Sequence, residues 1–351
     1  MANKNKRITT NDIAKYAGVS QSTVSLVLTG KSGASISEET VRRVMDAAVI
    51  TGYIQPDEAQ NNTLLPDMTV GFIVPDLINP SFADNLSRAS VFMARHNIDL
   101  IVCNTEKNSE REIRFINHLM ERKVDGLIFT VTPSKPEMLE KINRKIPIVV
   151  IGETEAAANI PTVGINSVTA GELVMEHLYN LGHRRIAYIT PPIQSVSILR
   201  HRRLQGMKNF LGERDGLGTF HVYEQAAYTQ WNEDSFEVGM GYEQTRFALR
   251  DHPEVTAIIA QGDMIAIGVY KAIKEAGLRI PEDISVVGFD NIEMSKYITP
   301  RLTTVDYYNE MRSRQAFEYI LDCLRSTNTG SLFVEYRPRV VVRESTSPAR
   351  E

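Results

Sequence analysis

The densest run of basic side chains in the chain is Arg-His-Arg-Arg at positions 200–203. It follows an apolar run, Arg185–Thr190, whose residues predict a strand buried on both faces. Ligands of open α/β sheets bind beyond the carboxyl ends of the strands, and guanidinium groups donate hydrogen bonds in a fixed fork. The run predicts either a ligand clamp, with Arg203 as its best single candidate, or only the solvated start of a helix.

Acidic candidates occupy similar places. Asp290 ends the apolar run 284–288, so it is either a ligand-binding acid or a turn cap, and Asp263 follows the apolar run Ala257–Ala260. An enzyme would need a nucleophile beside a base, or paired carboxylates, and only these two acids offer themselves. Gly-x-Ser-x-Gly and His-Glu-x-x-His do not occur, and the P-loop-like run at 29–32 lacks its first glycine. We therefore expect no catalytic residue, no metal site and no cofactor.

A different group of candidates lies near the N-terminus, on the outward face of an expected helix over 21–28. Its side chains are amide, hydroxyl or aliphatic groups: Gln21, Ser22, Ser25, Leu26 and Thr29. An ordinary solvated helix face would more often carry Lys and Glu. Short donors, acceptors and methyl groups are what a helix needs to contact base edges in the DNA major groove.

Three short helices must position this face. Thr9 and Asp12 predict a capping box, Ser20 predicts a cap after a Gly-Val-Ser turn, and a third helix is expected over 37–50. Two helices joined by a short glycine-containing turn form a helix-turn-helix, although a plain three-helix bundle has the same pattern. The polar outward face favours the helix-turn-helix. Residues 1–55 also carry seven Lys and Arg against four Asp and Glu, whereas the whole chain has a net charge of −4.

The rest of the chain alternates apolar runs with amphipathic stretches, which predicts an α/β body with two doubly wound parallel sheets. With 351 residues, 42% of them hydrophobic, the chain is long enough for two or three globular domains. It has no apolar stretch that would span a membrane, and its polar N-terminus does not predict a secretory signal. Two cysteines, Cys103 and Cys323, build no disulfide framework. We expect a cytoplasmic protein.

Residues 8–28 resemble the DNA-binding headpiece of the lactose/galactose repressor family. Further stretches resemble that family's effector domain, in the same order: 123–128, 181–186, 278–291 and 298–304. The resemblance implies a transcription regulator that binds a pseudo-palindromic operator as a homodimer and is switched by a small molecule. The molecule would bind between two periplasmic-binding-protein-like subdomains, and a sugar or sugar derivative is expected.

The resemblance also implies boundaries: headpiece 1–55, hinge 56–68, body 69–345 and tail 346–351. The body's first subdomain would comprise about 69–164 and 306–331, and its second about 165–302 and 332–345. Residues 343–351 carry no leucine heptad, so a dimer is expected rather than a tetramer. The family's hinge wedges an apolar side chain into the minor groove. Counted without gaps, Asn62 stands at that position, so we expect weak insertion.

Position by position, the resemblance implies site residues. Base contacts would come from Gln21, Ser22 and Leu26, with Thr29 on the same face, and phosphate contacts from Thr9, Ser20 and Ser25. The effector pocket would include Ser81, Phe82, Glu153, Arg203, Phe236, Asp263 and Asp290. Glu153 would replace an acid that the family often has where Gly152 stands, and Gly262 stands where sugar-binding members often have Asn.

Two other classes of protein remain as alternatives. A solute-binding protein shares the expected body but would need a secretory signal and no headpiece. A sugar-acting α/β enzyme would need catalytic groups that the strand ends do not offer. Both alternatives are therefore less favoured than a ligand-switched regulator.

Overall fold

The computed structural model describes residues 8–29, 36–53, 68–153, 159–193, 198–212, 218–225, 236–325 and 331–350. The chain forms two compact units, Met1–Met68 with Phe92–Asp99, and Thr69–Val91 with Leu100–Glu351. We call residues 8–53 the headpiece and residues 68–350 the body. The expected hinge at 56–68, with Asn62, lies outside the described residues except for Met68, which begins the first strand of the body. None of the helices in the described ranges is long and apolar enough to cross a membrane.

The headpiece contains the three expected helices. They are α1 (Thr10–Ala17), α2 (Gln21–Thr29) and α3 (Glu38–Ile50). Ile13, Val24, Val44 and Ala48 are fully buried between them, so one side chain or more from each helix forms the core. The turn between α1 and α2 depends on Gly18, which has a φ of 65° and ends α1 in the left-handed region.

Hydrogen bonds at the helix ends fix the two N-termini. The Thr9 N–H donates to Asp12 Oδ2 at 2.9 Å, and the Thr9 hydroxyl donates to the same oxygen at 2.7 Å. Ser20 Oγ accepts from the Thr23 N–H at 3.1 Å, which satisfies a donor at the first turn of α2. The predicted cap at Ser20 is confirmed. The predicted capping box of Thr9 and Asp12 is also present.

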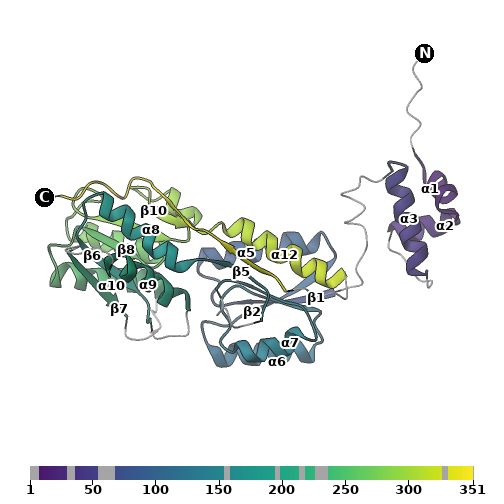
Figure 1. The fold of residues 1–351 in the computed structure, drawn as a ribbon, viewed down its shortest axis with the longest axis horizontal. Helices are drawn as coiled ribbons and strands as arrows, with labels where there is room; N and C mark the ends of the chain where they lie inside the picture. The colour runs from purple at the N-terminus through teal and green to yellow at the C-terminus, as the bar shows by residue number, and fades with distance from the viewer. Residues whose placement is uncertain are drawn as a thin grey trace, which may run out of the picture. The chain divides into compact units, whose positions relative to one another are not determined.

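The body contains two six-stranded sheets (Figure 1). The first has the order β11-β5-β4-β3-β1-β2, and its neighbours from β11 to β1 pair in parallel. Its strands are β1 (Met68–Val74), β2 (Ile98–Asn104), β3 (Gly126–Phe129), β4 (Ile148–Ile151), β5 (Thr162–Ile165) and β11 (Phe333–Tyr336). Figure 1 shows α5 (Pro80–Ala94) and α12 (Asn309–Arg325) on one face, and α6 (Ser109–Glu121) and α7 (Pro136–Asn143) on the other.

The second sheet has the order β12-β10-β9-β8-β6-β7 and is parallel except for β12, which pairs antiparallel with β10. Its strands are β6 (Arg185–Thr190), β7 (Thr219–Glu224), β8 (Ala257–Ala260), β9 (Ser285–Phe289), β10 (Thr303–Asp306) and β12 (Arg339–Val341). Its helices are α8 (Ser167–Asn180), α9 (Ile198–Gly212), α10 (Phe236–Asp251) and α11 (Asp263–Glu275), and a 3-10 turn, η1 (Glu293–Lys296), follows β9.

Alternate side chains of the central strands enter different cores. Ile186 and Tyr188 of β6 pack in the cluster formed with α8 and α9, whereas Ala187 and Ile189 pack in the cluster formed with α10 and α11. A strand with a layer of helices on each face must be apolar at every position, which is why the parallel strands appear as continuous apolar runs. The predicted α/β class is confirmed.

The chain crosses between the two sheets three times, but two of the predicted boundaries are wrong. β11 was assigned to the second subdomain within 332–345, yet it pairs in parallel with β5 as the edge of the first sheet. The third crossing therefore lies at 337–338. Asp306 was expected to begin the return to the first subdomain, but it ends β10 in the second sheet. β11 is half exposed, and β10 is buried but mostly polar, so neither sequence has the apolar run that marks a central strand.

The residues after β12 run along the second sheet, so the expected tail at 346–351 is not separate from the fold. The Val286 N–H donates to Ser345 O at 2.8 Å, and the Ala349 N–H donates to Leu181 O at 2.7 Å. The buried His183 imidazole lies 3.0 Å from Ser347 O through Nε2 and 2.9 Å from Thr256 Oγ1 through Nδ1. His183 thus has a structural role.

This histidine predicts a pH dependence of stability. Burial lowers the pKa of His183 from its ordinary 6.5 to about 4. Between these values the unfolded chain binds the proton and the folded chain does not, so the free energy of unfolding falls as the pH falls. From about pH 7 to about pH 5.5 the contribution of His183 is a loss of about 1 kcal/mol. Urea unfolding of wild type and His183→Gln at both pH values measures it, and equal pH slopes would contradict the prediction.

Candidate DNA-reading face and ligand pocket

The structure places the predicted DNA-reading side chains on α2. Gln21 and Ser22 are exposed, and Ser25 and Leu26 are half-buried. The Gln21 amide Nε2 donates to Thr10 Oγ1 at 3.1 Å, which orients the amide at the start of the helix. The side chain of Thr29 lies outside the described part of the structure. A short, exposed, oriented amide at a helix N-terminus can bond two adjacent groups of one base.

The residues expected to contact phosphate, Thr9 and Ser20, are exposed and lie at the first turns of α1 and α2. Ser25 is half-buried on the same helix as Gln21. Helix N-termini present backbone N–H groups and a positive partial charge, which attract phosphate. The Arg43 guanidinium donates to the carbonyls of Ala17 and Gly18, so α3 holds the turn between these two N-termini.

Ser20 caps α2 and is expected to contact phosphate, and two substitutions test these roles separately. Ser20→Ala is expected to destabilise the headpiece by about 1 kcal/mol, because the cap on the Thr23 N–H is lost. Ser20→Asp keeps a cap but brings a carboxylate to the phosphates, so it should weaken binding to operator and random DNA alike. Hydrogen exchange of headpiece amides and gel-shift titration measure the two effects. Unchanged hydrogen exchange in Ser20→Ala would contradict the capping role. Wild-type DNA binding by Ser20→Asp would contradict the phosphate contact.

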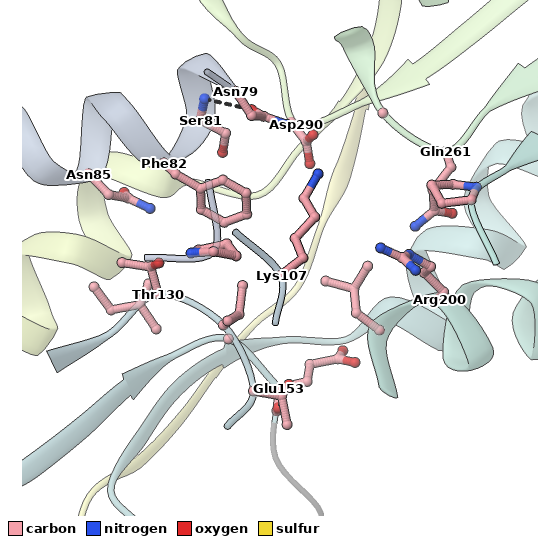
Figure 2. Close-up of a pocket in the computed structure, with 18 of the residues that line it drawn as sticks. Asn79, Ser81, Phe82, Asn85, Lys107, Thr130, Glu153, Arg200, Gln261 and Asp290 are labelled. Atoms are coloured by element: carbon pink, nitrogen blue, oxygen red, sulfur yellow. Dashed lines mark hydrogen bonds between the residues drawn. The ribbon is translucent and has the colours of Figure 1, made fainter. Parts of the chain in front are cut away.

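The body contains a cavity of about 300 Å³ lined by residues of both subdomains. Eight of the lining residues directly follow the last residue of a strand: Pro75, Thr105, Thr130, Gly152, Pro191, Gln261, Asp290 and Tyr307. Figure 2 shows Ser81, Phe82 and Asn85 of α5 on one side of the cavity, and Gln261 and Arg200 on the other. The carboxyl ends of the two sheets therefore face one pocket, as expected for a ligand site of open α/β sheets.

Arg203 and Asp290 meet in this pocket. Arg203 is 2% exposed, and its Nη2 lies 3.8 Å from Asp290 Oδ1. Its guanidinium carbon lies 4.2 Å from the centroid of the Phe289 ring, and its Nη1 donates to Gln261 O. The alternative that this position is the solvated start of a helix is wrong for Arg203. It holds for His201, which is exposed.

Burial raises the pKa of the Asp290 carboxyl to about 7, while the Arg203 guanidinium opposes that shift. Asp290 also has a φ of 102°, a backbone conformation that an L-residue rarely adopts. Strain of this kind persists only where the surrounding structure enforces it. These features make Asp290 more than a turn cap, since the backbone is held so that the carboxylate lines the pocket.

Glu153 also lines the pocket and is 3% exposed. Its Oε1 accepts from the Ser167 N–H at 2.6 Å, and burial raises its pKa. Its Oε2 has no hydrogen-bond partner among the described residues, although Arg202 Nη1 lies 3.7 Å away. A buried carboxylate oxygen without a hydrogen bond is costly, so it is a natural acceptor for a ligand hydroxyl.

Two predicted pocket residues lie elsewhere. The Asp263 carboxylate accepts from Thr304 Oγ1 at 2.6 Å and from the Ile292 N–H at 3.0 Å, and it is 1% exposed outside the pocket lining. It ties α11 to the loop after β9, so its role is structural. Phe236 is also absent from the lining, and its ring centroid lies 5.8 Å from the Lys107 ammonium nitrogen.

The sequence did not single out several polar residues of the pocket. Glu237 accepts from Asn79 Nδ2 at 2.8 Å and from Lys107 Nζ at 3.1 Å, which joins the two subdomains across the pocket. Gln261 directly follows β8, so the strand-end argument that selected Asp290 would have found it. Arg312 comes from α12, more than 200 residues from β1. No local sequence pattern indicates that α12, which lies near the C-terminal end of the chain, contributes a residue to the pocket.

The comparisons agree with this geometry. Residues 9–56 match the bacterial regulatory proteins of the lacI family, and residues 175–346 match the periplasmic binding protein-like domain. The chain is 30% identical over 337 residues to the ribose operon repressor of Haemophilus influenzae, covering 96% of this chain and 98% of that protein. The chain belongs to the LacI family. This LacI-family chain is therefore a ligand-responsive, DNA-binding transcription regulator and not an enzyme.

Two further similarities support this assignment. The repressor PurR of Edwardsiella ictaluri is 30% identical over 342 residues, which cover 96% of each chain. A solved LacI-family regulator from Enterococcus faecium with bound ribose has a TM-score of 0.68 and 26% identity, covering 80% of this chain and all of that one. The headpiece of this LacI-family regulator distinguishes it from a solute-binding protein.

Proposed function

We propose that this regulator acts in the cytoplasm as a homodimeric repressor on a pseudo-palindromic operator, and that a neutral sugar or sugar derivative in the pocket controls its affinity for DNA. Gln21, Ser22 and Leu26 contact bases in this proposal, and Thr9, Ser20 and Ser25 contact phosphate. Arg203, Asp290 and Glu153 bind hydroxyl groups of the ligand. The contact between Arg203 of α9 and Asp290, which directly follows β9, in the pocket that the two sheets face is the observation that carries the ligand proposal.

The charges of the pocket favour an uncharged ligand. The lining contains four cationic side chains, Lys107, Arg200, Arg203 and Arg312, and four acidic ones, Glu112, Glu153, Glu237 and Asp290. The cations already contact acceptors of the protein, as Lys107 contacts Glu237 and Arg203 contacts Asp290. A phosphate would have to displace these acids, whereas hydroxyl groups can donate to carboxylates and accept from guanidinium groups.

The pocket offers a sugar both buried polar atoms that lack hydrogen bonds among the described residues and an aromatic ring. Arg203 Nε and Arg312 Nε are buried without hydrogen-bond partners among the described residues, as is Glu153 Oε2. Phe82 offers an aromatic ring in the lining of the same pocket (Figure 2). The similar regulator from Enterococcus faecium holds ribose, and a similar protein of Haemophilus influenzae is named for the ribose operon. Pentoses are therefore the first ligands to test.

The experiment combines two assays on the full chain. Thermal unfolding is measured with ribose, other pentoses, hexoses, nucleosides and ribose 5-phosphate, because a ligand that binds only the folded state raises the melting temperature. The stabilising ligand is then added to a gel shift with DNA from upstream of the protein's own gene. A neutral sugar that stabilises the chain and changes the gel shift supports the proposal. Stabilisation by phosphorylated compounds alone would overturn the ligand class.

A further inference from the structure

Two histidines and a glutamate gather at the outer edge of the second sheet. His221 lies on β7, the edge strand, while His252 and Glu254 lie in the turn between α10 and β8. That turn is fixed by backbone hydrogen bonds from the His252 N–H to Ala248 O at 2.9 Å and from the Val255 N–H to His252 O at 3.1 Å. None of the three residues lines the ligand pocket, so the proposed function does not use them.

We propose that His221, His252 and Glu254 form a binding site for a divalent transition-metal ion, with Zn²⁺ as the best-suited ion. One ligand atom of each residue lies within 4.8 Å of the other two. Two imidazole nitrogens and a carboxylate oxygen are a ligand set that zinc accepts, and a Zn–N distance of roughly 2.0 Å puts tetrahedral ligand atoms roughly 3.3 Å apart. His252 Nδ1 and Glu254 Oε1 already lie 3.2 Å apart.

The third ligand needs a small rotation. The His221 and His252 rings stack with centroids 3.4 Å apart and an angle of 16° between their planes. A nitrogen lone pair lies in the plane of its ring, so two stacked rings cannot both point at one ion. His252 has a side chain 32% exposed and therefore has space to turn about χ2. The His221 Nε2 is buried without a hydrogen-bond partner among the described residues, so coordination would satisfy it.

The electrostatic environment favours a cation. His252 follows the C-terminal end of α10, where the helix dipole attracts positive charge. The adjacent cation, Arg250, contacts Asp251 at 2.7 Å.

The test is a calorimetric titration of the untagged full chain with ZnCl₂ near neutral pH, followed by thermal unfolding. We expect one ion per chain and a higher melting temperature. His252→Ala and His221→Ala should abolish this binding, and Glu254→Gln should weaken it about tenfold or more. His201→Ala is the matched control, because His201 is an exposed histidine outside the cluster and its loss should change nothing.

The buried thiols of Cys103 and Cys323 are competing ligands, so Co²⁺ is titrated as well. Co²⁺ bound by nitrogen and oxygen ligands shows d–d absorption bands, without the intense sulfur-to-cobalt charge-transfer band that thiolate ligands give. Absence of saturable binding, unchanged binding in both histidine variants, or a thiolate spectrum would overturn the proposal. Should a histidine variant fail to fold, two other measurements test the site. They are the zinc affinity of Glu254→Gln and the ¹⁵N chemical shifts of the His221 ring in the wild-type chain on zinc addition. Unmoved shifts would also overturn it.

Discussion

Replacing Arg203 by alanine is expected to abolish the response to ligand while DNA binding and dimerisation persist. Arg203 is the buried cation that faces Asp290 and packs on the Phe289 ring, so its removal deletes hydrogen-bond donors from the pocket and leaves Asp290 without its opposing charge. A ligand changes DNA affinity only through its different affinities for the two states of the protein. A variant that no longer binds ligand is therefore expected to bind DNA and to dimerise, but its DNA affinity no longer changes when ligand is added.

The measurement is the ligand dose dependence of the gel shift, with a melting curve to show that the variant folds. Asp290→Asn is expected to give a similar loss, because the amide has one acceptor oxygen where the carboxylate has two, and it carries no negative charge. His201→Ala, which changes an exposed residue of the same helix, serves as the control and should respond as wild type does. A response of Arg203→Ala with an unchanged dose dependence would place the ligand site elsewhere.

Gln21→Ala is expected to lower affinity for the cognate operator by about 1–3 kcal/mol with little change on random DNA. The Gln21 amide is exposed at the start of α2 and is oriented by Thr10, so it can form two hydrogen bonds to one base. A phosphate contact would behave differently, because it contributes to every DNA sequence. Titrations of operator and random DNA at one fixed salt concentration separate the two cases.

Thr10→Ala supplies the control for that prediction. It removes the hydrogen bond that orients the amide but keeps the amide itself, so its loss of operator affinity should be smaller than that of Gln21→Ala. Equal losses on operator and random DNA in Gln21→Ala would exclude a base contact. A loss in Thr10→Ala as large as in Gln21→Ala would assign the effect to headpiece geometry instead.

The sequence was sufficient to predict the strands that are buried on both faces and the residues that follow these strands. The runs Arg185–Thr190 and Ala257–Ala260 are strands with the predicted bounds, and Asp290 lies at the pocket because the carboxyl ends of parallel strands share one edge. Asp263 shows the limit of this argument. It too follows a strand closely, yet its carboxylate bonds to Thr304 and Ile292, residues that only tertiary structure brings to it.

The same limit explains the wrong boundary at 332. β11 is half exposed, as its Phe333 and Glu335 are open to solvent, so hydrophobicity gives no sign of a strand there. Its position is decided by parallel pairing with β5, a contact between residues more than 160 positions apart. Arg312 and Asn309 enter the pocket through the same long-range return of the chain.

The three crossings have a consequence for how the protein is made. The first sheet obtains its edge strand from 333–336, and one of its faces is covered by α12, where Phe317 packs 6.5 Å from Phe72. During synthesis these pieces leave the ribosome last, so the first subdomain stays incomplete until nearly the whole chain has been translated. The headpiece needs only the first 53 residues for its core. A ribosome that stalls late therefore releases a chain with a finished DNA-binding unit and no finished ligand pocket.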